Sequence, residues 1–174
     1  LKSAIANAEQ NDITVVSSAG NDGADTLYYP ASYSSVLKIA AINESNVIAN
    51  FSTFGSDIDF AAPGVNIITT GLNNSYSSVK GTSYASPFVS AIVAAMLSVD
   101  NKMSTEDIKD ALIFDAIEVH EDDSKLKCGY GVVHAPELKA EGLGGKNKTA
   151  APLFSLKSFF YSEEINLEIF CDTP

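Results

Sequence analysis

The chain has 174 residues, of which 45% are apolar and 19% are charged, and its formal net charge is −11. This length fits one compact domain with a short remainder, and the apolar fraction excludes a wholly disordered chain. The excess of carboxylates repels nucleic acid phosphates and acidic membrane surfaces, so we expect neither as a partner. The most apolar stretch, residues 91–97, is far shorter than the roughly 20 residues of a membrane-spanning helix, so we expect no membrane span.

The cysteines and histidines do not form a recognisable metal or disulfide pattern. Cys128 and Cys171 are too few for a disulfide framework or a zinc site, and His120 and His134 lack the spacing of metal ligands. The sequence therefore indicates no required cofactor.

The first third of the chain alternates between helical and strand-like patterns. Residues 1–8 carry apolar side chains at helical spacing. Residues 13–16 and Val36–Ile42 are short apolar runs typical of buried parallel strands. A third short strand is expected at residues 60–62, where it meets the strong turn signal Pro63-Gly64.

The pattern changes in the middle of the chain. Residues 65–69 and 76–79 favour an antiparallel hairpin. Small and apolar residues occupy all sides of the helix expected at residues 83–99, which predicts burial all round. Ser104 begins a capping signal for a further helix. Strands that alternate with helices predict an α/β fold with a mostly parallel sheet.

Three segments contain residues whose side chains could take part in a reaction. Asn21 lies just past the end of an expected buried strand, where ligand sites of parallel sheets occur, although it is also typical of an ordinary turn. Ser83 lies at the start of the buried helix, where it is either a helix cap or a nucleophile that benefits from the helix dipole. Residues 60–65 form a strand that ends in a turn and are uninformative alone.

The order and spacing of these segments resemble those of the subtilisin-like serine proteases, or subtilases. The resemblance covers residues 1–140, and it is carried by Ser18-Ala19-Gly20-Asn21, Tyr29-Pro30-Ala31, Ala62-Pro63-Gly64-Val65, the segment Gly81-Thr82-Ser83-Tyr84-Ala85-Ser86-Pro87, and Gly129-Tyr130-Gly131-Val132-Val133.

The resemblance implies a three-layer fold and an endopeptidase that hydrolyses polypeptide substrates through an acyl-enzyme. Ser83 would be the nucleophile, and Asn21 with the Ser83 backbone N–H would bind the oxyanion. Thr82 would support the oxyanion hole. The resemblance also implies secretion or display at the cell surface.

The general base of such a protease is expected outside this chain. In subtilases the catalytic Asp and His precede the Ser, so both should lie before Leu1, and neither His120 nor His134 fits the role. We therefore expect residues 1–140 to be the C-terminal part of the catalytic domain, inactive alone and partnered by its N-terminal half. Residues 141–152 read as a linker, and residues 153–174 as the truncated start of a β domain.

Two further sites are implied by the resemblance. The S1 region for the substrate side chain would comprise Ser18, Ala19 and Gly20, and Tyr28 either lines this pocket or turns outward to solvent. A weak Ca²⁺ or Na⁺ site would use the carbonyls of Ala31, Tyr33 and Val36 together with the carboxylate of Asp59, unless Asp59 is simply a turn residue.

Two other functions fit the same residues. One is a subtilase-fold pseudoprotease, which would act as a binding or scaffold module with a degenerate triad upstream. The other is an unrelated α/β binding domain, which requires the order of the motifs to be coincidental. The presence of both Asn21 and Ser83 favours the enzyme, because a binding module needs neither.

Overall fold

The computed structural model of the chain describes residues 1–119 and 127–136. The expected linker at 141–152, the expected β segment at 153–174, His120 and Cys171 lie outside the described residues. The elements follow in the order α1 (Lys2–Gln10), β1 (Val15–Ser18), β2 (Val36–Ile42), β3 (Phe60–Pro63), β4 (Ile67–Gly71), β5 (Ser75–Val79), α2 (Thr82–Val99) and α3 (Thr105–Asp115).

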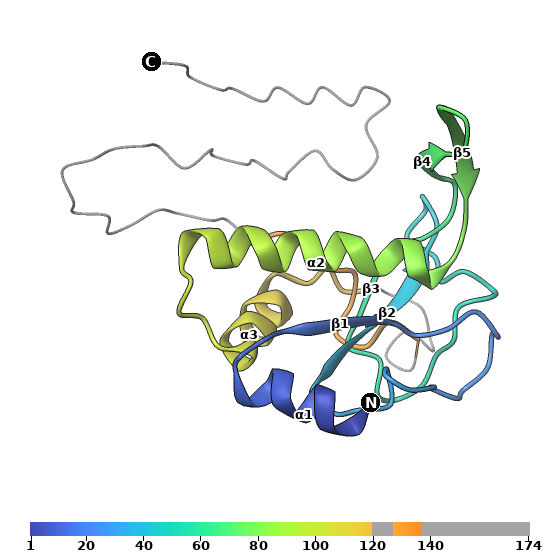
Figure 1. Cartoon of the computed structure of the whole chain (residues 1–174). Helices are drawn as coiled ribbons and strands as arrows, with labels where there is room; N and C mark the ends of the chain where they lie inside the picture. Colours follow the sequence, from blue (N-terminus) through green and yellow to red (C-terminus); the bar gives the residue numbers. More distant parts are fainter. Residues whose placement is uncertain (120–126, 137–174) are drawn as a thin grey trace, which may run out of the picture.

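The centre of the fold is a parallel sheet with the strand order β1-β2-β3. All seven residues of β2 are buried, as expected for the central strand of a sheet that is covered on both faces. Strands β4 and β5 form a separate antiparallel hairpin, which projects beside the start of α2 in Figure 1. The structure confirms the predicted α/β class.

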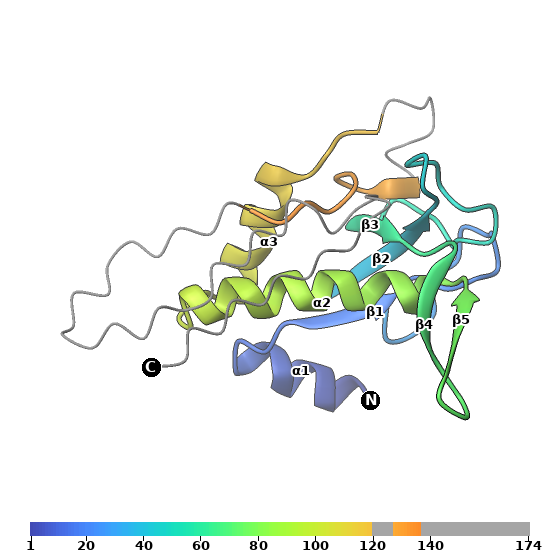
Figure 2. The ribbon, with the colours of Figure 1, turned by 90° about the horizontal axis from the view of Figure 1, so that it is seen from above.

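Helix α2 crosses one face of the sheet and forms most of the core there (Figure 2). Alternate residues of β2 point to this face because successive side chains of a strand alternate between faces. The buried residues of this cluster include Leu37, Ile39, Ala41, Phe60, Ala85, Val89, Met96, Ile108 and Leu112. Helix α3 belongs to the same cluster, because it contributes Ile108 and Leu112.

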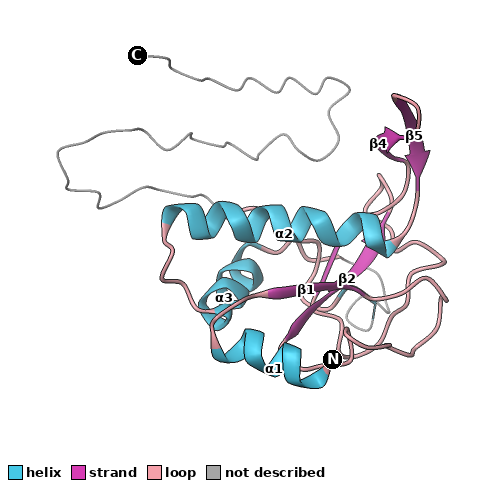
Figure 3. Cartoon of the chain, in the orientation of Figure 1, coloured by secondary structure: helices cyan, strands magenta, loops and turns pink. Residues whose placement is uncertain are grey.

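The other face of the sheet is covered by loops and by the segment after α3. Ala40 and Ile42 of β2 pack there with Cys128 and Val132. Val132 forms a parallel bridge with Ala61 of β3, which brings the expected closing segment back to the core. Figure 3 shows helices α2 and α1 on opposite sides of β1.

Burial of α2 differs from the sequence prediction. One face of the helix is buried against the sheet, whereas Pro87, Ala91 and Ala94 on the other face are exposed, so burial on all sides is not found within the described chain. By length and composition alone the helix could cross a membrane, a test that core helices also pass. Its packing across the sheet is that of a core helix.

The two other helices differ in their attachment. No residue of α1 is buried, and the main contact of α1 with the sheet is with β1. Helix α3 begins with a complete capping box, in which Ser104 and Asp107 each satisfy a backbone N–H of the other, as the sequence predicts.

Candidate active site

Asn21 and Thr82 meet at the carboxyl end of the sheet, although they are 61 positions apart in the sequence. Asn21 follows β1, and Thr82 is the first residue of α2. The backbone N–H of Thr82 donates to Asn21 Oδ1 at 2.9 Å, and the Thr82 hydroxyl donates to the same oxygen at 3.0 Å. The hydroxyl also accepts from the Gly20 N–H at 3.2 Å. These bonds fix the orientation of the Asn21 amide.

The remaining hydrogen-bonding group of that amide, Nδ2, points toward the start of α2. A Cβ atom built on Gly81 would lie 3.6 Å from Asn21 Nδ2. Because Oδ1 is occupied by Thr82, Nδ2 is the end of the Asn21 side chain that can donate to a ligand. An amide donor is the group that a developing oxyanion requires.

Ser83 is the second residue of α2 and its side chain is exposed. Its backbone N–H belongs to the first helical turn, whose donors lack intrahelical acceptors and lie at the positive end of the helix dipole. The structure thus brings the Ser83 hydroxyl, its N–H and the Asn21 amide to one end of α2. The fully buried Thr82 side chain anchors this end of the helix in the core.

Two glycines allow the close approach that builds this site. The Gly81 N–H donates to the Gly64 carbonyl at 2.8 Å, and Gly81 has a φ of 151°, which side chains rarely adopt. A Cβ on Gly64 would lie 2.6 Å from Ala41 Cβ and 2.9 Å from the Gly81 carbonyl oxygen. The turn that follows β3 therefore needs glycine in order to touch the segment that precedes Ser83.

The expected S1 residues lie on both sides of the end of β1. Ser18 is the last residue of β1, Ala19 is buried and donates its N–H to Ile39 O at 2.9 Å, and Gly20 contacts Thr82. Tyr28 lies in the loop between β1 and β2 with 59% of its surface exposed, which agrees with a ring turned to solvent. A contribution of Tyr28 to a substrate pocket stays a prediction.

Thr53 belongs to the site but was missed at the level of sequence. Its side chain is completely buried, its N–H donates to Gly20 O at 2.9 Å, and its hydroxyl accepts from the Asp22 N–H at 3.4 Å. Thr53 thus holds the loop on both sides of Asn21. Nothing in its neighbourhood distinguishes it, because a Ser-Thr pair in a polar loop is common and the contact spans more than 30 residues.

The residues of the expected cation site make other contacts in this structure. Asp59 is 4% exposed, and its carboxylate is paired with the ammonium groups of Lys38 and Lys109. The Tyr33 carbonyl accepts the Val36 N–H at 3.2 Å. Within residues 1–119 and 127–136, no cluster of three or more His, Cys, Asp or Glu side chains could hold a metal ion. The Asp59 carboxylate is thus already paired with cationic side chains of the chain, and the binding of Ca²⁺ or Na⁺ there stays a prediction.

Ser83 has no acid–base partner within the described part of the chain. His134 is the one histidine there, and no hydrogen bond joins it or any described aspartate to the Ser83 hydroxyl. The arrangement places an exposed hydroxyl beside N–H donors at the start of a helix, a combination that acyl transfer can use when a base is supplied.

Comparisons with known proteins identify the family of the chain. The sequence matches the subtilase family over residues 1–131. It is 34% identical over 134 residues to the minor extracellular protease Epr of Bacillus subtilis, with 76% of this chain and 21% of that protein covered. It is 37% identical over 122 residues to halolysin of Haloferax mediterranei, and the match covers 70% of this chain and 23% of halolysin. The chain thus spans less than a quarter of either relative.

A third relative is the major intracellular serine protease of Bacillus subtilis, 32% identical over 151 residues, with 81% of this chain and 47% of that protein covered. Among solved structures, the prenylagaramide maturation protease PagA is similar with a TM-score of 0.72 and 28% identity, and 78% of this chain and 52% of that chain are covered. The family match and the shared fold lead to one conclusion. This chain belongs to the subtilase family of serine proteases.

Proposed function

We propose that this chain supplies the nucleophile and the oxyanion hole of a serine endopeptidase. The observation that carries the proposal is the pair of hydrogen bonds from Thr82 to Asn21 Oδ1, because they leave the Asn21 Nδ2 group to donate beside Ser83. A structural Asn in a turn has no need of this orientation.

In the proposed reaction, the Ser83 hydroxyl oxygen attacks the carbonyl carbon of a peptide bond while a general base removes its proton. The carbonyl oxygen becomes an oxyanion, which accepts hydrogen bonds from Asn21 Nδ2 and the Ser83 N–H. Collapse of this intermediate breaks the C–N bond, and the amine leaves with the proton returned by the base. Water then hydrolyses the acyl ester by the same steps. This chemistry uses protein groups and requires no cofactor.

The general base and the missing cover of α2 are proposed to come from another segment of the same protease domain. The support is threefold: described residues place no His or Asp on Ser83, one face of α2 is exposed, and the relatives are much longer than this chain. A Ser without a base is a weak nucleophile. We therefore expect the 174-residue chain alone to hydrolyse no peptide and the full-length protein to be active.

The protein is proposed to act outside the cell. The support is that two relatives, Epr and the serine protease Nep of Natrialba magadii, are named as extracellular proteases, whereas one relative is named as intracellular. Fractionation of a culture of the source organism tests this location: protease antigen in the medium supports it, and antigen confined to lysed cells contradicts it.

The decisive experiment is labelling of the full-length protein with a fluorophosphonate, which reacts with an activated serine. We expect labelling of the wild type and of Ser90→Ala, which removes another exposed serine of α2, but no labelling of Ser83→Ala. A folded full-length protein that resists the reagent supports the pseudoprotease alternative instead. Labelling that persists in Ser83→Ala contradicts the assigned nucleophile.

A further inference from the structure

A cluster of charged residues lies at the opposite end of the sheet from Ser83. Lys38 is the third residue of β2, and Asp59 directly precedes β3. Because Ile39 pairs with Phe60 in the parallel register, Lys38 and Asp59 lie side by side on neighbouring strands. Their side chains share the sheet face that is opposite α2, and both residues are at least nine-tenths buried.

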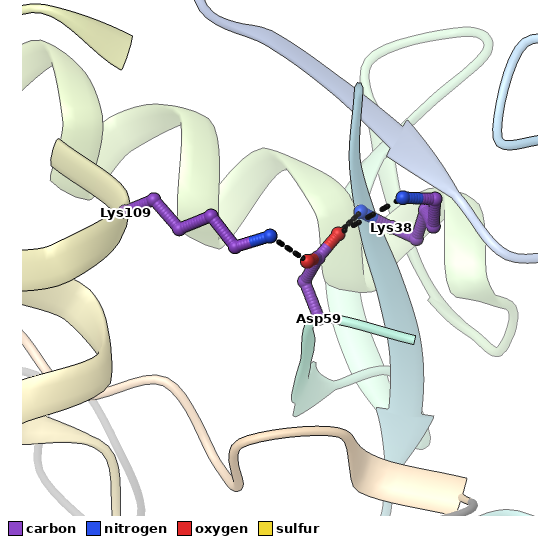
Figure 4. A network of polar contacts seen from close by, with 3 residues as sticks. All are labelled: Lys38, Asp59 and Lys109. Carbon is purple, nitrogen blue, oxygen red and sulfur yellow. Dashed lines mark hydrogen bonds and ion pairs between the residues drawn. The ribbon is translucent and has the colours of Figure 1, made fainter. Parts of the chain in front are cut away.

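Both oxygens of the Asp59 carboxylate are engaged by positive or N–H groups (Figure 4). Oδ2 accepts the Lys38 backbone N–H at 3.0 Å and lies 3.5 Å from Lys38 Nζ. Oδ1 accepts from Lys109 Nζ at 2.5 Å. The Lys109 ammonium reaches this point from α3 and also lies 5.6 Å from the ring centroid of Tyr130.

The charge count at Asp59 opposes a metal ion. Two ammonium groups share the Asp59 carboxylate, one from the buried Lys38 side chain and one from the partly exposed Lys109 side chain. A divalent cation bound directly to Asp59 would be repelled by both. Lys38 and Asp59 also line a cavity of about 740 Å³ together with Ser32, Ser34 and Asp57. Ser32 and Ser34 of the loop at residues 31–36 therefore border the same cavity as Lys38, at the place where the family resemblance implies a cation.

We propose that the Lys38 ammonium takes the place of a bound Ca²⁺ or Na⁺ ion in this protein, so that the chain carries its own cation for Asp59. The side chain enters from β2, and the paired carboxylate compensates for the burial of its charge. Lys109 closes the other side of the carboxylate and links α3 to the sheet. No dissolved cation then needs to bind Asp59 in order to stabilise this end of the fold.

The test measures thermal unfolding of the full-length protein in a chelator, in Ca²⁺ and in Na⁺, with choline chloride to match ionic strength. Lys38→Met removes the charge and keeps an unbranched side chain of similar size. Lys109→Met is the matched control, because it removes the outer ammonium and leaves Lys38 in place. Each protein is also made with Asp59→Asn. The cation response of that version comes from binding elsewhere in the molecule and is subtracted from the response of the protein with Asp59.

We expect no Asp59-dependent response to cations in the wild type or in Lys109→Met. In Lys38→Met, Asp59 Oδ2 loses its ammonium partner while Lys109 stays on Oδ1. Ca²⁺ or Na⁺ should then bind in the place of the lost ammonium, so the melting temperature should rise with cation concentration, by about 3–6 °C at ten times the dissociation constant. The added Asp59→Asn substitution should abolish this rise. If Lys38→Met does not fold in the chelator, the added cation should restore its folding.

Three results would overturn the proposal. The first is a melting temperature of the wild type that rises with added cation and no longer does so with Asp59→Asn, since the site would then bind a cation despite Lys38. The second is the absence of any cation response or rescue in Lys38→Met. The third is an equal response in Lys109→Met, which would show that the outer lysine controls the site.

Discussion

The side-chain oxygen of Asn21 accepts hydrogen bonds from both the backbone N–H and the hydroxyl of Thr82, at 2.9 and 3.0 Å. One residue of α2 therefore sets the direction of an amide that belongs to the end of β1. The two elements contact each other directly through the core, so the orientation of the amide is tied to the packing of the fold.

The first prediction concerns the oxyanion donor. Asn21→Ala in the full-length protein removes the Nδ2 group, whose hydrogen bond should strengthen as the oxyanion forms. We expect kcat to fall by about 10²–10³, the loss measured in a subtilisin for this kind of substitution, with a small change in KM. Steady-state kinetics on a peptide substrate measure both. A large rise in KM at constant kcat would assign Asn21 to ground-state binding instead.

The second prediction separates positioning from donation. Thr82→Val keeps the shape of the side chain and the backbone bond to Asn21 but removes the hydroxyl. We expect a loss of about 0.5–1.5 kcal/mol in unfolding free energy, because the part-buried hydrogen bonds of the hydroxyl to Gly20 and Asn21 are lost, together with a fall in kcat. In a double-mutant cycle with Asn21→Ala, the two effects on kcat should be non-additive. Full additivity would show that Thr82 does not act through Asn21.

Several elements could be predicted from the sequence because local patterns determine them. The apolar run Val36–Ile42 coincides with β2, and Ser104 with Asp107 forms the expected capping box. The position of Asn21 beside Ser83 followed from the family resemblance and from the rule that sites lie at the carboxyl ends of parallel strands.

Other features depend on register and could not be predicted. Lys38 stands inside an apolar run and gives no sign of its partner, since its contact with Asp59 exists only because β2 and β3 pair in one particular register. The burial of Thr53 against Gly20 also arises from a contact between distant loops. Composition alone cannot separate the exposed from the buried face of α2, because the exposed face carries small and apolar residues and no charged one.

The third prediction tests the close approach of the turn after β3 to the segment before Ser83. Gly64→Ala places a methyl group 2.6 Å from Ala41 Cβ and 2.9 Å from the Gly81 carbonyl oxygen, so the backbone must shift. We expect a loss of about 1–3 kcal/mol in unfolding free energy and a lower kcat. The matched control is Gly71→Ala in the hairpin, where the nearest atom is the hydroxyl of Ser75.

Circular dichroism in a urea series measures both variants. The control should stay within about 0.5 kcal/mol of the wild type, since Gly71 is an exposed hairpin residue. Equal losses in the two variants would show that glycine content, and not the contact with Gly81, determines the effect.

The last prediction follows from the capping box of α3. The Ser104 hydroxyl donates to Asp107 at 2.6 Å and the Ser104 backbone N–H at 2.9 Å, and these bonds lower the pKa of the Asp107 carboxyl below its usual value of 3.8. A carboxyl whose pKa is lower in the folded state stabilises the fold above its unfolded pKa. This contribution is lost as the pH falls through the folded-state pKa.

The wild type should therefore exceed Asp107→Ala in unfolding free energy by a constant amount above about pH 5, and the difference should shrink as the pH falls below 3.8. Urea unfolding at a series of pH values measures this difference, and other carboxylates cancel because both proteins contain them. In a Ser104→Ala background the dependence on pH should weaken, because the donor hydroxyl is absent. A difference that grows toward low pH would mean that folding raises the pKa of Asp107, which the geometry of the capping box contradicts.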